Sequence, residues 1–206
     1  MRKPPATGNP RRAQRRTEII AAARRIVAKR GVEALTVSEL EARLHYTRGV
    51  ITYHFRNMDE VVAAVFRSAI DEIDAATSAE VEASASPAGA LRAIVHANVN
   101  GFLTHIEATR ILLSFWGRLA IDRRFRKLNR DLYATYRART ASLLRLGHAA
   151  GAFRDVDVDH MAALIVGIVI GVVAQTHFDP RAVDPAALVD EATATLLARL
   201  TSPPSR

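Results

Sequence analysis

The chain has 206 residues, of which 49% are hydrophobic and 24% charged, and this balance is typical of a globular protein. The length allows either one core or a small head fused to a larger body. The sequence contains no cysteine, which excludes a disulfide framework, a thiolate metal site and a cysteine nucleophile. The first ten residues lack the apolar run of a secretory signal, so we expect a cytoplasmic protein.

The positive charge is concentrated at the N-terminal end. Residues 1–60 contain 13 Lys or Arg and 6 Asp or Glu, whereas the remaining 146 residues contain 16 and 15. Nearly all of the net charge of +8 therefore belongs to the first 60 residues. A basic head on a nearly neutral body predicts an anionic partner for the head alone. The plainer alternative, a solvated basic tail, is less favoured because the basic residues continue into a segment with helical periodicity.

The chain begins with a tail and a basic helix. Residues 1–10 contain three prolines and one glycine without an apolar pattern, and we expect them to form a disordered basic tail. Between residues 11 and 30, apolar side chains recur at helical spacing. Gly31 is a typical stop signal for this helix.

Capping patterns mark the next helices. Thr36 and Glu39 match the capping box, in which a hydroxyl accepts from a free N–H and a carboxylate reaches back. They predict a short helix that ends near residue 44. After a break of a few residues, Thr47 is placed to cap a second short helix that ends near residue 55.

The rest of the chain also has helical periodicity. Asn57 and Glu60 repeat the capping pattern before a helix whose apolar face extends from Val61 to Ile73. No convincing alternation of strand length occurs, so we predict an all-α fold. Further helices or apolar helical stripes are expected at about 91–102, 112–119, 122–147, 158–177 and 185–200.

The segment from residue 35 to residue 60 carries the most specific pattern. Its two short capped helices lie on either side of a brief break, and the second contains Arg48, Tyr53 and His54. A helix of this kind fits the major groove of DNA, where its first side chains reach base edges. Any three-helix packing could also give two short capped helices. The charge asymmetry makes us favour DNA binding.

The same residues resemble a known family. The segment from Arg11 to Val65, and above all TRGVITYHF at residues 47–55, is similar to the DNA-binding head of the TetR family of bacterial repressors. The body resembles, less sharply, the branch that includes the choline-responsive betaine repressor, in the segments 115–116, 122–139, 151–154 and 171–175. Because bodies in this family diverge strongly, the resemblance does not transfer choline as the ligand.

The resemblance implies two domains with different functions. Residues 11–57 are expected to form a three-helix, helix-turn-helix DNA-binding domain, and residues 58–206 a helical effector-binding and dimerisation domain. Arg48 is the strongest guanine reader by its forked donors, and Val50 suits a thymine methyl group. The residues expected at the DNA are Arg15, Arg16, Thr36, Thr47, Arg48, Gly49, Val50, Thr52, Tyr53 and His54.

Three positions depart from the family pattern. His45 occupies a turn where the family usually has Gly, which requires a left-handed backbone at some cost. Thr52 stands where Tyr is more common, so one phosphate contact is expected from a shorter hydroxyl. Met58 replaces a frequent Lys, which removes one carried-over phosphate contact.

The body contains an unusually apolar helix. Residues 161–174 include no polar side chain, but a membrane span needs roughly twenty apolar residues, so we expect a buried helix. Gly167 and Gly171 share one face and allow close approach of another helix. Ordinary packing inside one subunit would also explain them. We favour a dimer contact, because the resemblance implies a homodimer built on a four-helix bundle.

A small-molecule site would be a largely apolar cavity with a few polar groups. Asn98 is the most suggestive residue, because it lies on an otherwise apolar stripe. A buried Asn bonded only to protein, and aromatic residues acting as plain core, are the competing interpretations. The residues we expect at such a site are Asn98, Phe102, Trp116, Tyr133, Tyr136, Gln175 and His177.

The sequence does not support an enzyme. The seven His are scattered, and no phosphate loop, nucleophile elbow or metal-binding spacing occurs, so we expect no cofactor and no metal. Together with the charged head, the resemblance implies a sequence-specific regulator, a repressor that a small-molecule ligand releases from a palindromic operator. The alternatives are a non-specific architectural DNA-binding protein whose body only dimerises, a membrane-surface or protein-interaction module, and an activator.

Overall fold

A computed structural model describes residues 10–201, and over this range the chain is helical without a strand. The expected tail at residues 1–10 lies outside the described residues except for Pro10, which begins the first helix. The α-helices are α1 (Pro10–Arg30), α2 (Val37–Leu44), α3 (Arg48–His54), α4 (Met58–Glu82), α5 (Pro87–Thr104), α6 (Ile106–Trp116), α7 (Arg123–Ala149), α8 (Val158–Phe178) and α9 (Pro185–Thr201), and a short 3-10 helix, η1, covers Val32–Ala34.

The chain divides into two compact units. Unit 1 contains residues 1–71 and 107–121, and unit 2 contains residues 72–106 and 122–206. The helix α4 therefore contributes to both units, and α6 belongs to unit 1 although it follows α5 in the sequence.

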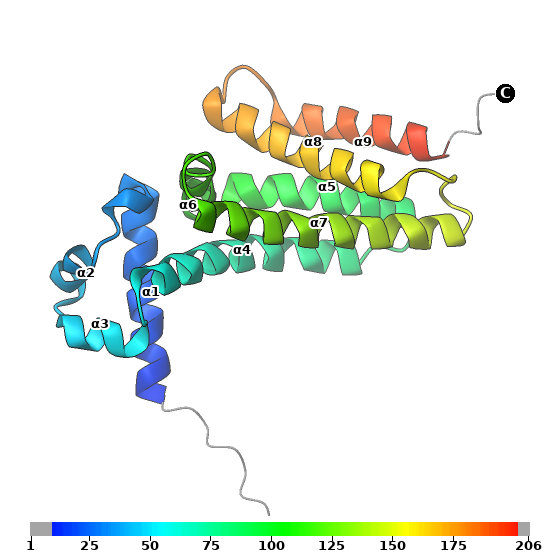
Figure 1. The fold of residues 1–206 in the computed structure, drawn as a ribbon. Coiled ribbons are helices and arrows are strands. Elements are labelled where there is room, and N and C mark those ends of the chain that lie inside the picture. The colour runs from blue at the N-terminus through cyan, green and yellow to red at the C-terminus, as the bar shows by residue number, and fades with distance from the viewer. Residues whose placement is uncertain (1–9, 202–206) are drawn as a thin grey trace, which may run out of the picture. The chain divides into compact units, whose positions relative to one another are not determined.

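Unit 1 is organised around α1, α2 and α3 (Figure 1). One face of α1 carries Ile19 and Ile26, which are fully buried, as is Leu40 of α2. Ile51 and Phe55 bring the apolar side of α3 into the same core. Because α3 has only seven residues, its stability comes from this packing rather than from its own hydrogen bonds.

The helix caps follow the sequence pattern in part. The Thr36 hydroxyl accepts a hydrogen bond from the Glu39 backbone N–H at 3.2 Å, as predicted. The carboxylate of Glu39 does not reach back, because it pairs with Arg30 at 2.9 Å and Arg43 at 3.1 Å. Thr47 stands at the cap of α3 but makes no side-chain cap bond, so that part of the prediction is wrong.

The turn between α2 and α3 contains the predicted backbone feature. His45 has φ 53° and ψ 32°, the left-handed conformation. It is the one non-glycine residue with positive φ among the described residues. Tyr46, the next residue, donates a hydrogen bond from its hydroxyl to the carboxylate of Glu18 on α1. This bond ties the turn to α1 and fixes where α3 begins.

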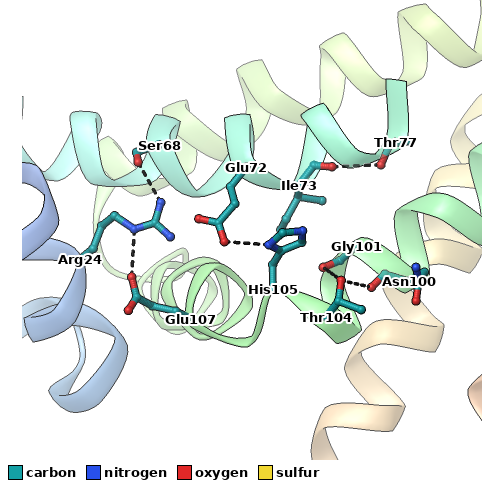
Figure 2. A network of polar contacts seen from close by, with 10 residues as sticks. All are labelled: Arg24, Ser68, Glu72, Ile73, Thr77, Asn100, Gly101, Thr104, His105 and Glu107. Atoms are coloured by element: carbon teal, nitrogen blue, oxygen red, sulfur yellow. Dashed lines mark hydrogen bonds and ion pairs between the residues drawn. The ribbon is translucent and has the colours of Figure 1, made fainter. Parts of the chain in front are cut away.

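Polar bonds fasten α6 inside unit 1. Arg24 of α1 bonds to Glu107 of α6 at 3.0 Å and to Ser68 of α4 at 2.8 Å (Figure 2). The Ser114 hydroxyl accepts a hydrogen bond from the Val32 backbone N–H at 3.0 Å. Unit 1 therefore contains α6 besides α1, α2, α3 and the first part of α4, and the apolar stripe at residues 112–119 did not assign this helix to it.

Unit 2 is a bundle of α5, α7, α8 and α9 that also includes the C-terminal part of α4 (Figure 1). Its core includes the buried residues Leu91, Leu144, Ile165 and Leu200. Within this unit, His105 at the end of α5 contacts the Glu72 carboxylate at 2.8 Å (Figure 2). α4 extends nine residues beyond the apolar face predicted from the sequence, to Glu82.

The α7–α8 junction is closely packed. Gly151 adopts φ 70° after the end of α7. The chain then folds back, so that the Ala152 and Phe153 backbone N–H groups donate to the Gly147 carbonyl at 2.9 Å and 3.1 Å. A Cβ atom on Gly147 would lie 2.1 Å from the Phe153 ring, so only glycine fits there without displacement of the ring.

α8 alone among the helices of the described chain is long and apolar enough, by length and composition, to cross a membrane. One such helix is weak support for a membrane location, because core helices of soluble proteins pass the same test. The buried residues Met161, Ile165, Val169 and Val172 on one side of α8 belong to the core of unit 2.

Candidate DNA-binding surface and effector cavity

The outer face of α3 consists of residues that can contact a partner. Arg48, Gly49 and Thr52 are exposed, and Tyr53 is 67% exposed although it is a large aromatic residue. Val50 is half-buried. Ile51 and Phe55 occupy the opposite, buried face. This separation follows from helical periodicity, and it leaves the first turn and the outer flank of α3 open to a groove.

A basic cleft lies between the first two turns of α1 and the recognition-type helix α3. Its volume is about 530 Å³. Three arginines of α1 face five residues at the start and along the flank of α3. The cleft is lined by Arg11, Arg12, Arg15, Thr47, Gly49, Val50, Tyr53 and His54. No acidic residue belongs to this lining, so the cleft attracts an anion.

Arginine–aromatic contacts hold α1 against α3. The Arg12 guanidinium lies 5.4 Å from the centre of the Tyr53 ring, and that of Arg16 lies 4.4 Å from the Phe55 ring. Such cation–π contacts favour a fixed side-chain position while the N–H groups remain able to donate. Arg15 lines the cleft beside α3, whereas Arg16 lies against Phe55 and does not line the cleft.

His54 lies in an environment that disfavours its protonated form. Burial, followed by the positive charges of Arg12, Arg15 and Arg16, lowers the pKa of His54 below its usual value. Its Nδ1 atom is buried and makes no hydrogen bond within the described chain. A phosphate close to this cleft would offset the charge of the arginines by its negative charge, and it would offer His54 a hydrogen-bond acceptor.

The three predicted hydroxyl contacts differ in what they can donate. The Thr36 hydroxyl accepts from a backbone N–H, so its own proton is free to point outward. The Thr47 side chain lines the cleft and makes no cap bond. The Thr52 hydroxyl donates to the Arg48 and Gly49 carbonyls at 3.0 Å and 3.3 Å, so it must turn before it can donate to a phosphate.

A second concave site lies inside unit 2. It has a volume of about 270 Å³. Its wall is largely apolar, with aliphatic side chains from α5, α7 and α8 and aromatic rings from α5 and α7. The cavity is lined by Asp74, Thr77, Ser78, Val81, Glu82, Ile94, Asn98, Phe102, Tyr133, Tyr136, Arg139, Thr140, Leu143, Ile165, Val166, Val169 and Ile170. An apolar cavity with a few polar groups is the usual form of a small-molecule site.

A cluster of three polar residues on one wall of the cavity is centred on Asp74. One oxygen of its carboxylate accepts from the Tyr136 hydroxyl at 3.0 Å, and the other accepts from the Arg139 guanidinium at 2.9 Å. Burial, with the nearby Asp74 charge as the next cause, raises the pKa of the Tyr136 phenol. The phenol is therefore protonated at neutral pH and keeps its hydroxyl as a donor to Asp74.

The structure brings together four of the seven residues predicted for the effector site. Asn98, Phe102, Tyr133 and Tyr136 line the cavity, and the Asn98 amide donates to its own helix at the Ile94 carbonyl, 2.7 Å away. Three others do not line it. Trp116 belongs to unit 1, and Gln175 and His177 are exposed near the end of α8.

Sequence reasoning missed the charged residues of the cavity and several of its hydroxyl groups. Asp74, Thr77 and Glu82 lie in the part of α4 beyond the predicted apolar face. Arg139 and Thr140 follow Tyr136 by three and four positions on α7, so all three project from one side of that helix. The spacing could have identified Arg139 and Thr140 as lining residues, because Tyr136 was already a candidate for the cavity.

Comparison with known proteins agrees with this architecture. The sequence model of the BetI-type transcriptional repressor C-terminal domain matches residues 87–202, and that of the bacterial regulatory proteins of the tetR family matches residues 19–65. The HTH-type transcriptional regulator BetI of Burkholderia thailandensis is 28% identical over 174 residues, which cover 82% of this chain and 87% of that protein.

Solved structures share the fold. A transcriptional regulator from Saccharomonospora viridis, crystallised in complex with choline, superposes with a TM-score of 0.78 at 19% identity, and the match covers 93% of this chain and all of the other. A TetR-family regulator from Cytophaga hutchinsonii gives 0.78 at 17% identity over 96% of this chain and all of its own. The chain belongs to the TetR family of bacterial transcriptional regulators with a BetI-type C-terminal domain, and it is a DNA-binding regulator rather than an enzyme.

Proposed function

We propose that this regulator is a cytoplasmic homodimer that represses transcription from a palindromic operator and leaves it when a small molecule occupies the cavity of unit 2. The observation that carries the DNA-binding part is the basic cleft beside the exposed face of α3. It combines a helix whose first turn can reach base edges with arginines that attract phosphates independently of sequence.

Arg48 is the residue we assign to base readout. It is exposed in the first turn of α3 and does not line the cleft. The Arg48→Ala variant is expected to cost about 1–3 kcal/mol of operator affinity and to relax the preference at one base pair. The measurement is a selection from genomic fragments, followed by footprinting of the recovered site with both proteins. An equal loss on all sequences would make Arg48 a phosphate contact instead.

Arg15 is the residue we assign to phosphate attraction. The Arg15→Ala variant should reduce the slope of log affinity against log salt by about one per phosphate contact, with little change in base preference. Arg25→Ala is the matched control, because Arg25 is exposed on the same helix but does not line the cleft. Equal slopes for Arg15→Ala and the unmodified protein would remove Arg15 from the DNA interface.

The proposed dimer is supported by the outer face of α8. Leu164 is 53% exposed, and beyond the adjacent backbone of α8 no described atom lies within 4 Å of a Cβ built on Gly167 or Gly171. The neighbouring helix α9 exposes small residues, including Ala187 and Ala194. Two chains that pack these faces would form a four-helix bundle, and a two-fold dimer reads two half-sites about 34–36 Å apart.

The release by a ligand is supported by the cavity and by one relative. The Saccharomonospora viridis regulator holds choline, and the cavity of unit 2 offers a small molecule an apolar wall and a polar group. A ligand that favours the conformation unable to hold DNA lowers operator affinity by no more than its differential affinity for the two states. A titration of the operator complex with candidate metabolites measures this directly.

A further inference from the structure

The hydrogen-bonding groups around the cavity are mostly acceptors. Thr77 donates its hydroxyl proton to the Ile73 carbonyl at 3.1 Å, and Thr140 donates its own to the Tyr136 carbonyl at 3.0 Å. Tyr136 donates to Asp74. A hydroxyl that has donated its only proton offers lone pairs alone, so these three groups accept rather than donate toward a ligand.

The charged residues of the lining also favour a ligand that donates hydrogen bonds. Two carboxylates, Asp74 and Glu82, line the cavity together with one cation, Arg139. The Arg139 side chain is 60% exposed, whereas that of Asp74 is 22% exposed. A carboxylate has about four lone-pair sites, and the bonds from Tyr136 and Arg139 occupy two of those on Asp74. Asp74 therefore keeps acceptor capacity, and the lining keeps one excess negative charge.

The remaining wall accommodates hydrocarbon. Phe102, Leu143, Ile165 and Val169 line the cavity from three helices of unit 2. An anionic head group would have to approach two carboxylates, and the one cation of the lining is Arg139, besides the neutral donors of Ser78, Asn98 and Tyr133. A protonated amine would instead supply the missing positive charge and several N–H donors, and charge-assisted bonds of this kind are roughly twice as strong as neutral ones.

We propose that the cavity binds an amphipathic amine in its protonated form, with the ammonium N–H groups bonded to Asp74 and the neighbouring acceptors and the hydrocarbon part between α5, α7 and α8. This proposal rests on the proposed function in taking the cavity as the effector site. It distinguishes an N–H-bearing ammonium from a quaternary ammonium, which carries the same charge on nitrogen but has no N–H to donate.

Four probes of one chain length test the proposal with the full-length protein at pH 7.5. They are hexylammonium, hexyltrimethylammonium, hexanoate and hexanol, and binding is measured by calorimetry and by thermal shift. An alkylammonium resembles the Lys side chain, with a pKa near 10.4, and is protonated at this pH. Hexylammonium is expected to bind about tenfold or more tightly than each of the others, because a hydrogen bond to a charged group contributes about 1.5–3 kcal/mol.

Three variants locate the effect. Asp74→Asn keeps an acceptor for Tyr136 and removes the charge, so it should lower hexylammonium affinity about tenfold and leave hexanol unchanged. Glu82→Gln changes an exposed residue and should give a smaller loss, which keeps the test valid even if Asp74→Asn fails to fold. Glu80→Gln is the control, because Glu80 lies on the same helix and does not line the cavity.

Equal or tighter binding of hexanoate, hexanol or hexyltrimethylammonium would overturn the proposal, as would the absence of binding by all four probes. Operator binding by the same preparation is measured in parallel. Intact operator binding with the wrong probe preference refutes only the amine. Loss of all sequence preference on DNA refutes the proposed function itself.

Discussion

The protonation of His54 depends on the charged cleft in which this side chain lies. Its ring is half-buried beside three arginines that belong to α1, and none of them is adjacent to it in the sequence. Burial and these charges both favour the neutral imidazole. The helix α3 therefore presents a neutral His54 in the free protein, next to side chains that attract phosphate.

This environment predicts a pH dependence of folding stability. The pKa of His54 is lower in the folded chain than in the unfolded chain, so the unfolded chain binds more protons between the two values. The stability associated with His54 is thus complete above its unfolded pKa, near 6.5, and is lost as the pH falls below it. Urea unfolding of the protein and of His54→Gln, between pH 5 and pH 8, measures the difference.

The variant should lose less stability than the unmodified protein on acidification, while the contributions of the other six His cancel in the comparison. Identical pH profiles for the two proteins would contradict the assigned environment of His54.

Single residues also show what the sequence could predict about the turn and the cavity. The left-handed backbone at His45 was predictable from the resemblance, because the family usually has Gly at this turn, and it is confirmed. Asp74 was not predictable, because the expected apolar face ended at Ile73. Beyond this residue α4 continues through an alanine-containing segment, whose helicity comes from propensity rather than from an apolar stripe.

At the level of elements, the last turn of α7 depends on one glycine. The Gly147→Ala change would force a Cβ to within 2.1 Å of the Phe153 ring, which is buried. Overpacking of this kind costs about 1–3 kcal/mol of the free energy of unfolding, although the helix propensity of Ala returns up to about 1 kcal/mol. Chemical denaturation should therefore show a net loss.

A double-mutant cycle supplies the control. Phe153→Leu removes part of the ring and makes room, so the Gly147→Ala change should cost less in that background. Additive effects of the two changes would mean that the ring and the new methyl group do not meet.

The elements themselves were largely predictable, but their partners were not. The helices α1, α7, α8 and α9 begin and end close to the expected residues, because caps, glycines and prolines act locally, whereas α4 continues nine residues beyond its expected apolar face. The apolar stripe of α6 indicated only that one face is buried. Its place in unit 1 depends on distant contacts, such as that of Phe115 with Phe66. An apolar stripe does not identify the helix that packs against it. The sequence therefore led us to propose Trp116 for the cavity of unit 2, although this residue belongs to unit 1.

At the scale of the whole molecule, the functional boundary after residue 57 stays a prediction. The compact units are defined by packing and not by function, and in them residues 58–71 and 107–121 belong to unit 1. The family, the fold and the regulatory role follow from the matched sequence models. The DNA contacts, the effector and the dimer depend on molecules outside a single chain.

The dimer proposal predicts the effect of one bulky side chain on α8. Gly167→Leu is expected to leave the isolated chain unstrained, since a Cβ there meets no described atom within 4 Å beyond the adjacent backbone of α8. Across a close helix pair, the larger side chain should weaken association about tenfold or more, because overpacking costs about 1–3 kcal/mol. Sedimentation velocity measures the change, and circular dichroism verifies that the helices remain.

Ser142→Leu is the matched control, because Ser142 is an exposed residue of α7. It adds a leucine of the same size away from α8 and α9. A Gly167→Leu protein that sediments as the unmodified one does would place any association of this chain elsewhere.

If two chains pair through the exposed face of α8 as proposed, the stability of the protein depends on its concentration. Leu164 and Phe178 remain open in a single chain, at 53% and 77% exposure, and pairing would cover such a surface only when enough copies are present. Melting temperature should then rise with protein concentration by mass action. On dilution, the dimer would dissociate, and the protein would lose both thermal stability and simultaneous binding to the two half-sites. The rate of synthesis of the protein would then help to determine how much operator is occupied.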